Sequence, residues 1–310
     1  MKLDTIHCGD TLDIMRTWPD ACVHCIVTSP PYWGLRDYGV EGQLGLEKTP
    51  GEYVAKMVEI FAEVKRVLRD DGTLWLNLGD SYAAHNSGNN GYTDNRTNRK
   101  ERYAAGIPAG LKPKDLVGIP WRVAFALQSD GWYLRSDIIW HKPNPMPESV
   151  RDRCTKAHEY IFLLSKSARY FYDHEASKEP RQDWGTRDRK PGSAFVDGTP
   201  GRSKQGGGQN CNFADAGRNK RSVWTVATRP LKDAHFATFP PKLIEPCILA
   251  GCPEGGVVFD PFMGAGTTGL VARKHNRHYL GCELNPEYVA MAERRIRKAT
   301  ELPLFDRERA

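Results

Sequence analysis

Three glycines spaced as Gly-x-Gly-x-x-Gly, at Gly264, Gly266 and Gly269, form a candidate ligand-binding turn. They follow a short apolar run at 257–259 and open a stretch of helical character. Glycines in such a turn let the backbone bend tightly and approach a ligand closely, and the start of the helix offers free N–H groups. Glu283, at the end of the next β-rich run, is placed to accept hydrogen bonds from ribose hydroxyls. The pattern indicates a nucleotide-binding turn.

The place of this turn in the chain argues against a nicotinamide dehydrogenase, the first alternative for such a pattern. Forty-one residues follow Gly269 in a chain of 310, enough for one helix, one strand and one further helix. The remaining strands must therefore come from residues 1–175, whereas ordinary dehydrogenases begin with the glycine turn. The sequence predicts a sheet with a permuted strand order.

A second chemically distinctive segment, Ser29-Pro30-Pro31-Tyr32, follows the apolar run at 22–27. The prolines restrict φ and remove two backbone donors, so this loop presents acceptors. The Ser29 hydroxyl and the Pro30 carbonyl can accept hydrogen bonds from an amino group, and Tyr32 offers a flat face for stacking. Two such acceptors would localise the lone pair of a nucleobase amine for attack on an electrophilic methyl group. By itself the segment also fits a structural diproline turn.

Taken together and in this order, Ser-Pro-Pro-Tyr and Asp-Pro-Phe-x-Gly-x-Gly-Thr-Thr resemble the amino-group DNA methyltransferases of the permuted β class. The resemblance covers roughly residues 3–81, 116–175 and 223–296, and it includes the sequences WHKPNP and HEYIF. It implies an α/β, Rossmann-like fold of the S-adenosylmethionine-dependent methyltransferases. In that fold a mostly parallel, doubly wound sheet is circularly permuted, here with two basic loop insertions.

The resemblance also implies roles for individual residues, with S-adenosylmethionine as the cofactor and no metal. The catalytic loop that receives the target amine comprises Ser29, Pro30, Pro31 and Tyr32. The residues expected to bind the cofactor are Asp10, Thr238, Phe239, Asp260, Pro261, Phe262, Gly264, Gly266, Thr267, Thr268 and Glu283. Among them, Asp10 is expected to face the adenine amine and Glu283 the ribose, while Thr238 and Phe239 close over the cofactor.

The residue before the two prolines bears on which base is methylated. Cytosine-N4 members of the family typically carry Ser there, whereas adenine-N6 members of the β class more often carry Asp. Ser29 therefore favours cytosine-N4, and adenine-N6 stays as the alternative because either side chain accepts from either amine. Methylation at cytosine carbon 5 needs a thiol, and Pro246-Cys247 is a candidate pair. It precedes the glycine turn instead of following it, so Cys247 is expected in the core.

Positive charge gathers in two segments of a chain whose net charge is +6. Residues 83–115 hold six basic and three acidic groups, and residues 178–222 hold ten and five, so the rest of the chain is net negative. Both segments lack periodicity, and aromatic residues stand among their arginines, a composition suited to phosphate neutralisation and base stacking. The residues expected to bind DNA are Arg99, Lys100, Arg102, Arg181, Arg187, Arg189, Lys190, Arg202, Lys204, Arg218, Lys220 and Arg221.

The expected organisation has five parts. These are a catalytic-loop half (1–82), a mobile basic loop (83–115), the rest of the catalytic half (116–177), a DNA target-recognition insertion (178–222) and an S-adenosylmethionine-binding half (223–310). Short β-rich runs alternate with helical stretches along the chain, and they predict strands at 22–27, 73–78, 132–140, 160–164, 257–259 and 279–283. Helical periodicity predicts helices at 51–68, 118–128, 240–250, 267–275 and 285–298. The first is expected to be closed by Asp70-Asp71-Gly72, and the last to be capped by Asn285.

Composition limits the class of protein and its partners. With 40% hydrophobic residues the chain can bury a full α/β core, and its longest apolar runs fall short of the roughly 20 residues that span a bilayer. The first residues lack the apolar core of a secretion signal, so a cytoplasmic location and no membrane partner are expected. The resemblance to the amino-group DNA methyltransferases implies double-stranded DNA as a partner, and also a second copy of the chain as a homodimer and a cognate restriction enzyme. A catalytically inactive DNA-binding protein, or transfer to RNA or protein, stays as an alternative.

Cys22 and Cys25 have the spacing of a metal-binding pair, but the second Cys or His pair of a structural zinc site is missing. Buried thiols are the expectation for them.

Overall fold

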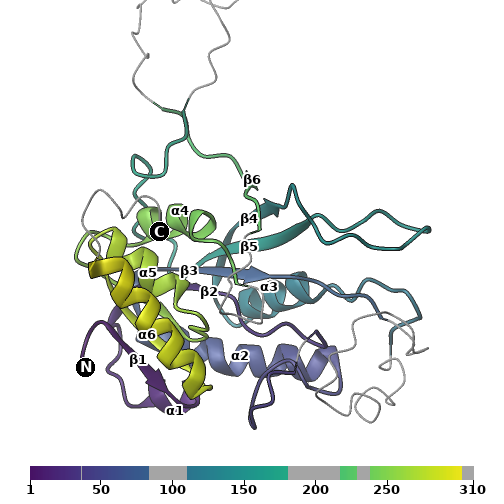
Figure 1. Cartoon of the computed structure of the whole chain (residues 1–310), viewed down its shortest axis with the longest axis horizontal. Helices are drawn as coiled ribbons and strands as arrows, with labels where there is room; N and C mark the ends of the chain where they lie inside the picture. The colour runs from purple at the N-terminus through teal and green to yellow at the C-terminus, as the bar shows by residue number, and fades with distance from the viewer. Residues whose placement is uncertain (36, 84–109, 181–216, 229–237, 302–310) are drawn as a thin grey trace, which may run out of the picture.

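The computed structural model describes residues 1–35, 37–83, 110–180, 217–228 and 238–301, in which eight strands form one sheet (Figure 1). The strand order is β1-β8-β7-β2-β3-β5-β4-β6. The strands are β1 (Thr5–Cys8), β2 (Val23–Thr28), β3 (Leu68–Leu78), β4 (Tyr133–His141), β5 (His158–Ser165), β6 (Val223–Thr225), β7 (Val257–Asp260) and β8 (His278–Glu283). The helices are α1 (Thr11–Arg16), α2 (Pro50–Val67), α3 (Ile119–Ser129), α4 (Pro241–Gly251), α5 (Thr267–Lys274) and α6 (Pro286–Glu301).

The directions of the strands confirm the expected permuted, mostly parallel sheet. Within the described strands, β5 alone runs against its neighbours, β3 and β4, and every other adjacent pair is parallel. The late strands β7 and β8 lie between the early strands β1 and β2. The carboxyl ends of β2, β3, β4, β7 and β8 therefore share one edge of the sheet, which is where open α/β sheets bind ligands.

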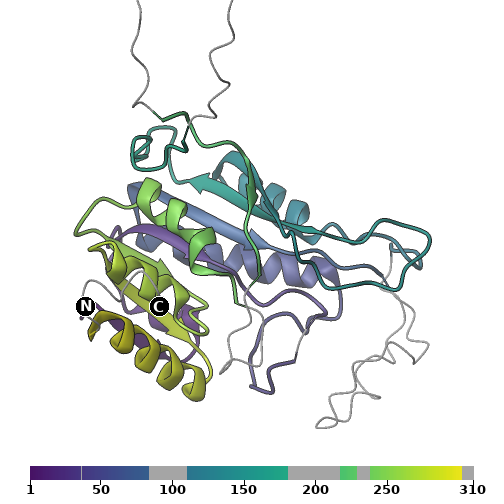
Figure 2. The same ribbon diagram turned by 45° about the horizontal axis from the view of Figure 1, so that its top comes forward.

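Helices cover both faces of the sheet, as a doubly wound fold requires (Figure 2). One hydrophobic cluster joins the sheet to α1, α2 and α3, and its members include Met15, Phe61 and Val123. The second cluster joins the opposite face to α4, α5 and α6, and it contains Ile248 and Ala292. The two cores hold the sheet rigid, so that loops at its edge have a fixed base.

Helix α2 shows how the sequence builds these elements. Thr49 caps its first turn by accepting from the Glu52 N–H at 3.1 Å, and the apolar side chains every three or four residues are buried. The expectation that residues 70–72 close this helix as a turn is wrong, because Leu68 already pairs with Val23 as the first residue of β3. The register between the two strands shifts here, so that residues 69–72 of β3 lie opposite one residue of β2, His24.

Three described elements were not predicted from the sequence: β1, α1 and β6. Each is six residues or shorter, and β6 has three. The N-terminal cap of α6 agrees with expectation, since the Asn285 side chain accepts from the Glu287 N–H at 2.9 Å.

In each of the two basic regions, the segment at its start lies beside the segment at its end. Tyr82 and Leu116 form an antiparallel bridge at the base of the first region, and Glu179 and Arg218 form another at the base of the second. Residues 84–109 and 181–216 lie outside the described part of the chain. Among the described helices, none has the length and apolar composition needed to cross a membrane.

Candidate functional site

The ends of β2 and β7 are joined by a buried carboxylate. Thr28 Oγ1 donates to Asp260 Oδ1 at 2.6 Å, and Thr268 Oγ1 of α5 donates to Oδ2 at 2.7 Å. The Phe262 N–H also donates to Oδ1, at 3.0 Å. Burial raises the pKa of Asp260 to about 6, because desolvation outweighs these three hydrogen bonds. This group holds the loop after β2 beside the glycine turn.

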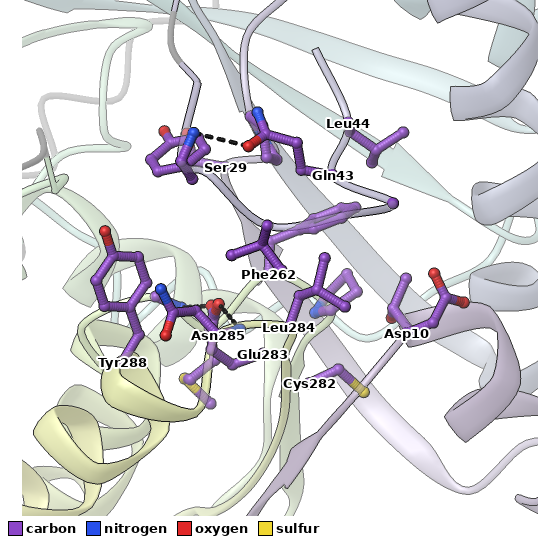
Figure 3. A pocket seen from close by; sticks show the side chains of 18 of the residues that line it. Asp10, Ser29, Gln43, Leu44, Phe262, Cys282, Glu283, Leu284, Asn285 and Tyr288 are labelled. Carbon is purple, nitrogen blue, oxygen red and sulfur yellow. Dashed lines mark hydrogen bonds between the residues drawn. The ribbon is translucent and has the colours of Figure 1, made fainter. Parts of the chain in front are cut away.

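A cavity opens at this edge of the sheet, and both sequence motifs contribute to its wall (Figure 3). Ser29 and Pro31 come from the loop after β2, while Phe262, Gly264 and Thr267 come from the glycine turn. The other expected residues in the lining are Asp10, Thr238, Phe239, Pro261 and Glu283. Two loops more than 200 residues apart in sequence therefore meet at one cavity.

Glu283 is anchored within the lining by backbone donors. Its Oε2 accepts from the Gly264 N–H at 2.8 Å and its Oε1 from the Asn285 N–H at 2.9 Å. A carboxylate has about four acceptor positions, so each oxygen keeps capacity for a further donor such as a ribose hydroxyl. Burial raises the pKa of Glu283. Asp10 combines two roles in the same way, since it caps α1 through the Leu12 and Asp13 N–H groups while lining the cavity.

The glycine turn needs glycine at Gly266 for two reasons. Its φ of +76° is strained for other residues, and a Cβ there would lie 2.8 Å from the Ala292 Cβ of α6. At the next position, Arg295 Nη1 donates to the Thr267 hydroxyl at 2.9 Å. Burial lowers the pKa of Arg295. The turn thus connects β7 to α5 and packs closely against α6.

Some expected site residues lie beside the cavity and not in its lining, namely Pro30, Tyr32, Asp260, Gly266 and Thr268. The ring of Tyr32 packs on Gly79, where a Cβ would approach a ring carbon to 2.5 Å. Its hydroxyl accepts from Ser29 Oγ at 3.2 Å and lies 2.8 Å from Glu159 Oε2. Burial and the nearby Glu159 raise the pKa of Tyr32. Stacking of this ring on a base stays a prediction.

The lining also contains residues that the sequence did not single out. Tyr38, Gln43 and Leu44 come from the loop before α2, where the Tyr38 N–H donates to Gln43 Oε1 at 2.7 Å. This loop carries no motif that would have marked it. Leu284 and Asn285 could have been found, because they directly follow Glu283.

Three of the twelve expected DNA-binding residues lie in the described part of the chain: Arg218, Lys220 and Arg221. The Nε atoms of Arg218 and Arg221 both lie 2.8 Å from Glu179 Oε1, which offsets part of their charge. Lys220 Nζ lies 5.0 Å from the ring centroid of Trp224. The residues outside the described ranges are Arg99, Lys100, Arg102, Arg181, Arg187, Arg189, Lys190, Arg202 and Lys204.

The thiols follow the expectation of buried side chains in part. Cys25 and Cys247 are fully buried, and Cys22 is half-buried. Burial raises the pKa of Cys247 well above its usual range, which suits a core residue and opposes a role as nucleophile. Among the described residues, no group of three or more His, Cys, Asp or Glu side chains gathers as a metal site.

Comparison with known proteins places this chain in a family. A family model described as DNA methylase, N6_N4_Mtase, matches residues 23–294. The chain belongs to this DNA methylase family. The type II methyltransferase M.XycI of Xanthomonas campestris pv. cyanopsidis is 51% identical over 296 residues, which cover 96% of this chain and 88% of that protein.

Two solved structures share the fold of this DNA methylase. TTHA0409 of Thermus thermophilus, in complex with S-adenosyl-L-methionine, has a TM-score of 0.61 at 23% identity and covers 95% of this chain and 93% of its own. The PvuII DNA methyltransferase, described as cytosine-N4-specific, has a TM-score of 0.63 at 19% identity, with coverages of 96% and 91%. At these identities the likeness concerns the fold.

Proposed function

We propose that this DNA methylase transfers a methyl group from S-adenosylmethionine to the N4 amine of cytosine in double-stranded DNA. The observation that carries the proposal is the shared cavity, in which Ser29 of the proline-rich loop and the glycine turn face the same space. An amine held at one end would thus meet a methyl donor held at the other. The TTHA0409 complex, with the same fold, supports S-adenosylmethionine as the donor.

The lining suits this cofactor. Acceptors for ribose hydroxyls and an adenine amine are available at Glu283 and Asp10, and apolar side chains such as Phe262, Phe239 and Leu284 offer contacts for the adenine ring. When bound, the cofactor supplies an electrophilic methyl group on a sulfonium. The residues of the chain bind and orient it, and they bring the amine into line with the methyl group.

The target base must leave the duplex to enter the cavity. An amine inside stacked DNA is out of reach, and methyltransferases solve this by extruding the nucleotide at a cost of a few kcal/mol. Ser29 then accepts one amine hydrogen, and the Pro30 carbonyl is the second proposed acceptor. The Pro31 carbonyl already accepts from Tyr53 Oη at 2.9 Å, which fixes the far side of the diproline.

Cytosine-N4 is proposed over adenine-N6 because of Ser29, and the cytosine-N4-specific PvuII enzyme of the same fold supports this choice. The decisive experiment methylates plasmid DNA with the pure protein and labelled cofactor, then identifies the modified nucleoside by mass. N4-methylcytosine is expected. N6-methyladenine would replace the proposal by its alternative, and DNA without label would overturn both.

The role of Ser29 is tested by Ser29→Ala. Removing one acceptor of the amine is expected to lower kcat about tenfold, the equivalent of one hydrogen bond, with the dissociation constant for S-adenosylmethionine unchanged. Ser129→Ala serves as the matched control, because that hydroxyl bonds the Phe125 carbonyl at the end of α3, away from the cavity. An unchanged kcat in Ser29→Ala would contradict the role.

A further inference from the structure

A short path of polar contacts leads away from the cavity at Ser29. Ser29 Oγ donates to Tyr32 Oη at 3.2 Å, and Tyr32 Oη donates to Glu159 Oε2 at 2.8 Å. Glu159, on β5, forms an ion pair with Lys142 directly after β4. The side chains of Glu159 and Lys142 are 16% and 19% exposed. A largely buried carboxylate therefore stands at the far end of the path.

The chemistry of Glu159 fixes the direction of each bond along this path. A carboxylate paired with Lys142 accepts hydrogen bonds and has none to donate. The raised pKa of Tyr32 keeps its phenol protonated, and that one proton points toward Glu159. The Tyr32 oxygen is then left as an acceptor for Ser29, so the single Ser29 proton points away from the cavity.

Asn77 on β3 supports the same direction. Its Nδ2 donates to the Tyr160 carbonyl at 3.0 Å and to Glu159 Oε2 at 3.3 Å. These two bonds turn Asn77 Oδ1 toward Tyr32 Oη, 3.1 Å away. The Tyr32 proton thus faces two acceptors, Asn77 Oδ1 and Glu159 Oε2. Neither of these side chains could donate to Tyr32 instead without losing one of its own bonds.

We propose that Glu159 is a positioning residue that sets this direction, so that Ser29 presents only lone pairs to the cavity. The inference rests on the proposed function, because an exocyclic amine is the group that such a surface selects. The N–H group of an amine can donate a hydrogen bond to the lone pairs of Ser29. A base that carries a keto oxygen at the corresponding position, as thymine does, would place lone pairs against lone pairs and would be rejected.

The test compares Glu159→Gln with the wild-type protein. Glutamine keeps the shape, but its amide oxygen pairs with Lys142, which only donates, and its amide N–H groups then face Tyr32. The expected result is a fall in kcat of about tenfold, the equivalent of one hydrogen bond, with the cofactor dissociation constant unchanged. The melting temperature should fall as well, because Lys142 loses its charged partner. Glu245→Gln is the matched control, since that glutamate is paired with His275 outside the cavity lining.

Tyr32→Phe provides a second variant, because it keeps the ring and removes the hydroxyl that connects Ser29 to Glu159. It is expected to lower kcat by itself, and adding Glu159→Gln to it should cause no further fall. Independent, multiplying effects would overturn the positioning role, as would a wild-type kcat in Glu159→Gln. If wild-type protein labels no exocyclic amine in DNA, the proposed function fails and the inference fails with it.

Discussion

Asp260 shows what burial does to a single ionisable group in this site. The residue is 1% exposed, and three protein donors serve its two carboxylate oxygens. A pKa raised to about 6 means that the folded state binds a proton more tightly than the unfolded state does. The resulting stabilisation is present below the unfolded pKa near 3.8 and is lost as pH rises through 6.

Asp260→Asn removes this titration and should flatten the dependence of stability on pH. Relative to the variant, the wild-type free energy of unfolding is expected to fall by about 2 to 3 kcal/mol between pH 4 and pH 7. Urea denaturation across this range measures it. Asp13→Asn, at a carboxylate whose side chain is 77% exposed, controls for the loss of an acidic group. If the free energy of unfolding changes with pH in the same way in wild type and Asp260→Asn, the raised pKa of Asp260 is refuted.

For individual residues, the sequence indicated the two motifs but not how their side chains bond. Ser29 and Glu283 could be singled out because their neighbours form recognisable patterns. The contact between Tyr32 and Glu159 joins residues 127 positions apart, and no local spacing encodes it. Likewise, Asp260 was expected to face the cofactor, whereas its oxygens bond Thr28, Thr268 and Phe262; its contact with the cofactor stays a prediction.

At the scale of elements, the close approach of α5 and α6 depends on Gly266. Gly266→Ala adds left-handed strain and a contact with Ala292, so it should lower the free energy of unfolding by about 2 to 4 kcal/mol and weaken cofactor binding. Gly255 has a similar φ of +72°, and nothing lies within 4 Å of the position that an added methyl group would take. Gly255→Ala should therefore cost about 1 kcal/mol, from strain alone. Denaturant melts measure both variants. If Gly266→Ala and Gly255→Ala lose the same free energy of unfolding, packing at Gly266 is unimportant.

Elements with a strong periodic pattern were predictable within a few residues, and α2 and β8 are examples. Elements held by partners distant in sequence were not. Strand β1 is four residues long and mixes polar with apolar side chains, so only its pairing with β8 makes it a strand. Residues 70–72 were expected to be a helix-ending turn, yet they continue β3 because Leu68 pairs with Val23. Pairing partners such as these are invisible to a local window.

At the scale of the whole molecule, the uneven charge predicts how DNA binding responds to salt. Neutralising Arg187, Arg189 and Lys190 together should weaken DNA binding and reduce the slope of log K against log salt by about 2 to 3, if each contacts one phosphate. Fluorescence anisotropy with a labelled duplex at several salt concentrations measures the slope.

The matched control for charge removal is Arg16→Gln with Arg69→Gln, because these arginines pair one-to-one with Asp13 and Asp71 and lie outside the segments expected to bind DNA. This pair of substitutions should change the slope by less than about one unit, since neither arginine is expected to contact a phosphate. If the control and the triple variant shift the slope equally, the slope reports the net charge of the chain, and the expected contacts at 187–190 are wrong.

The permuted sheet also has a consequence for how the molecule assembles. Strands β7 and β8 are made last, yet they occupy places between β1 and β2, and Thr5 pairs with Leu280. Until they arrive, β1 has no neighbour and the edge of β2 stays open. Pairings between such distant residues are slow to form. The nascent chain must therefore keep an exposed strand edge for most of its synthesis, which makes this half of the sheet the part most dependent on protection from aggregation.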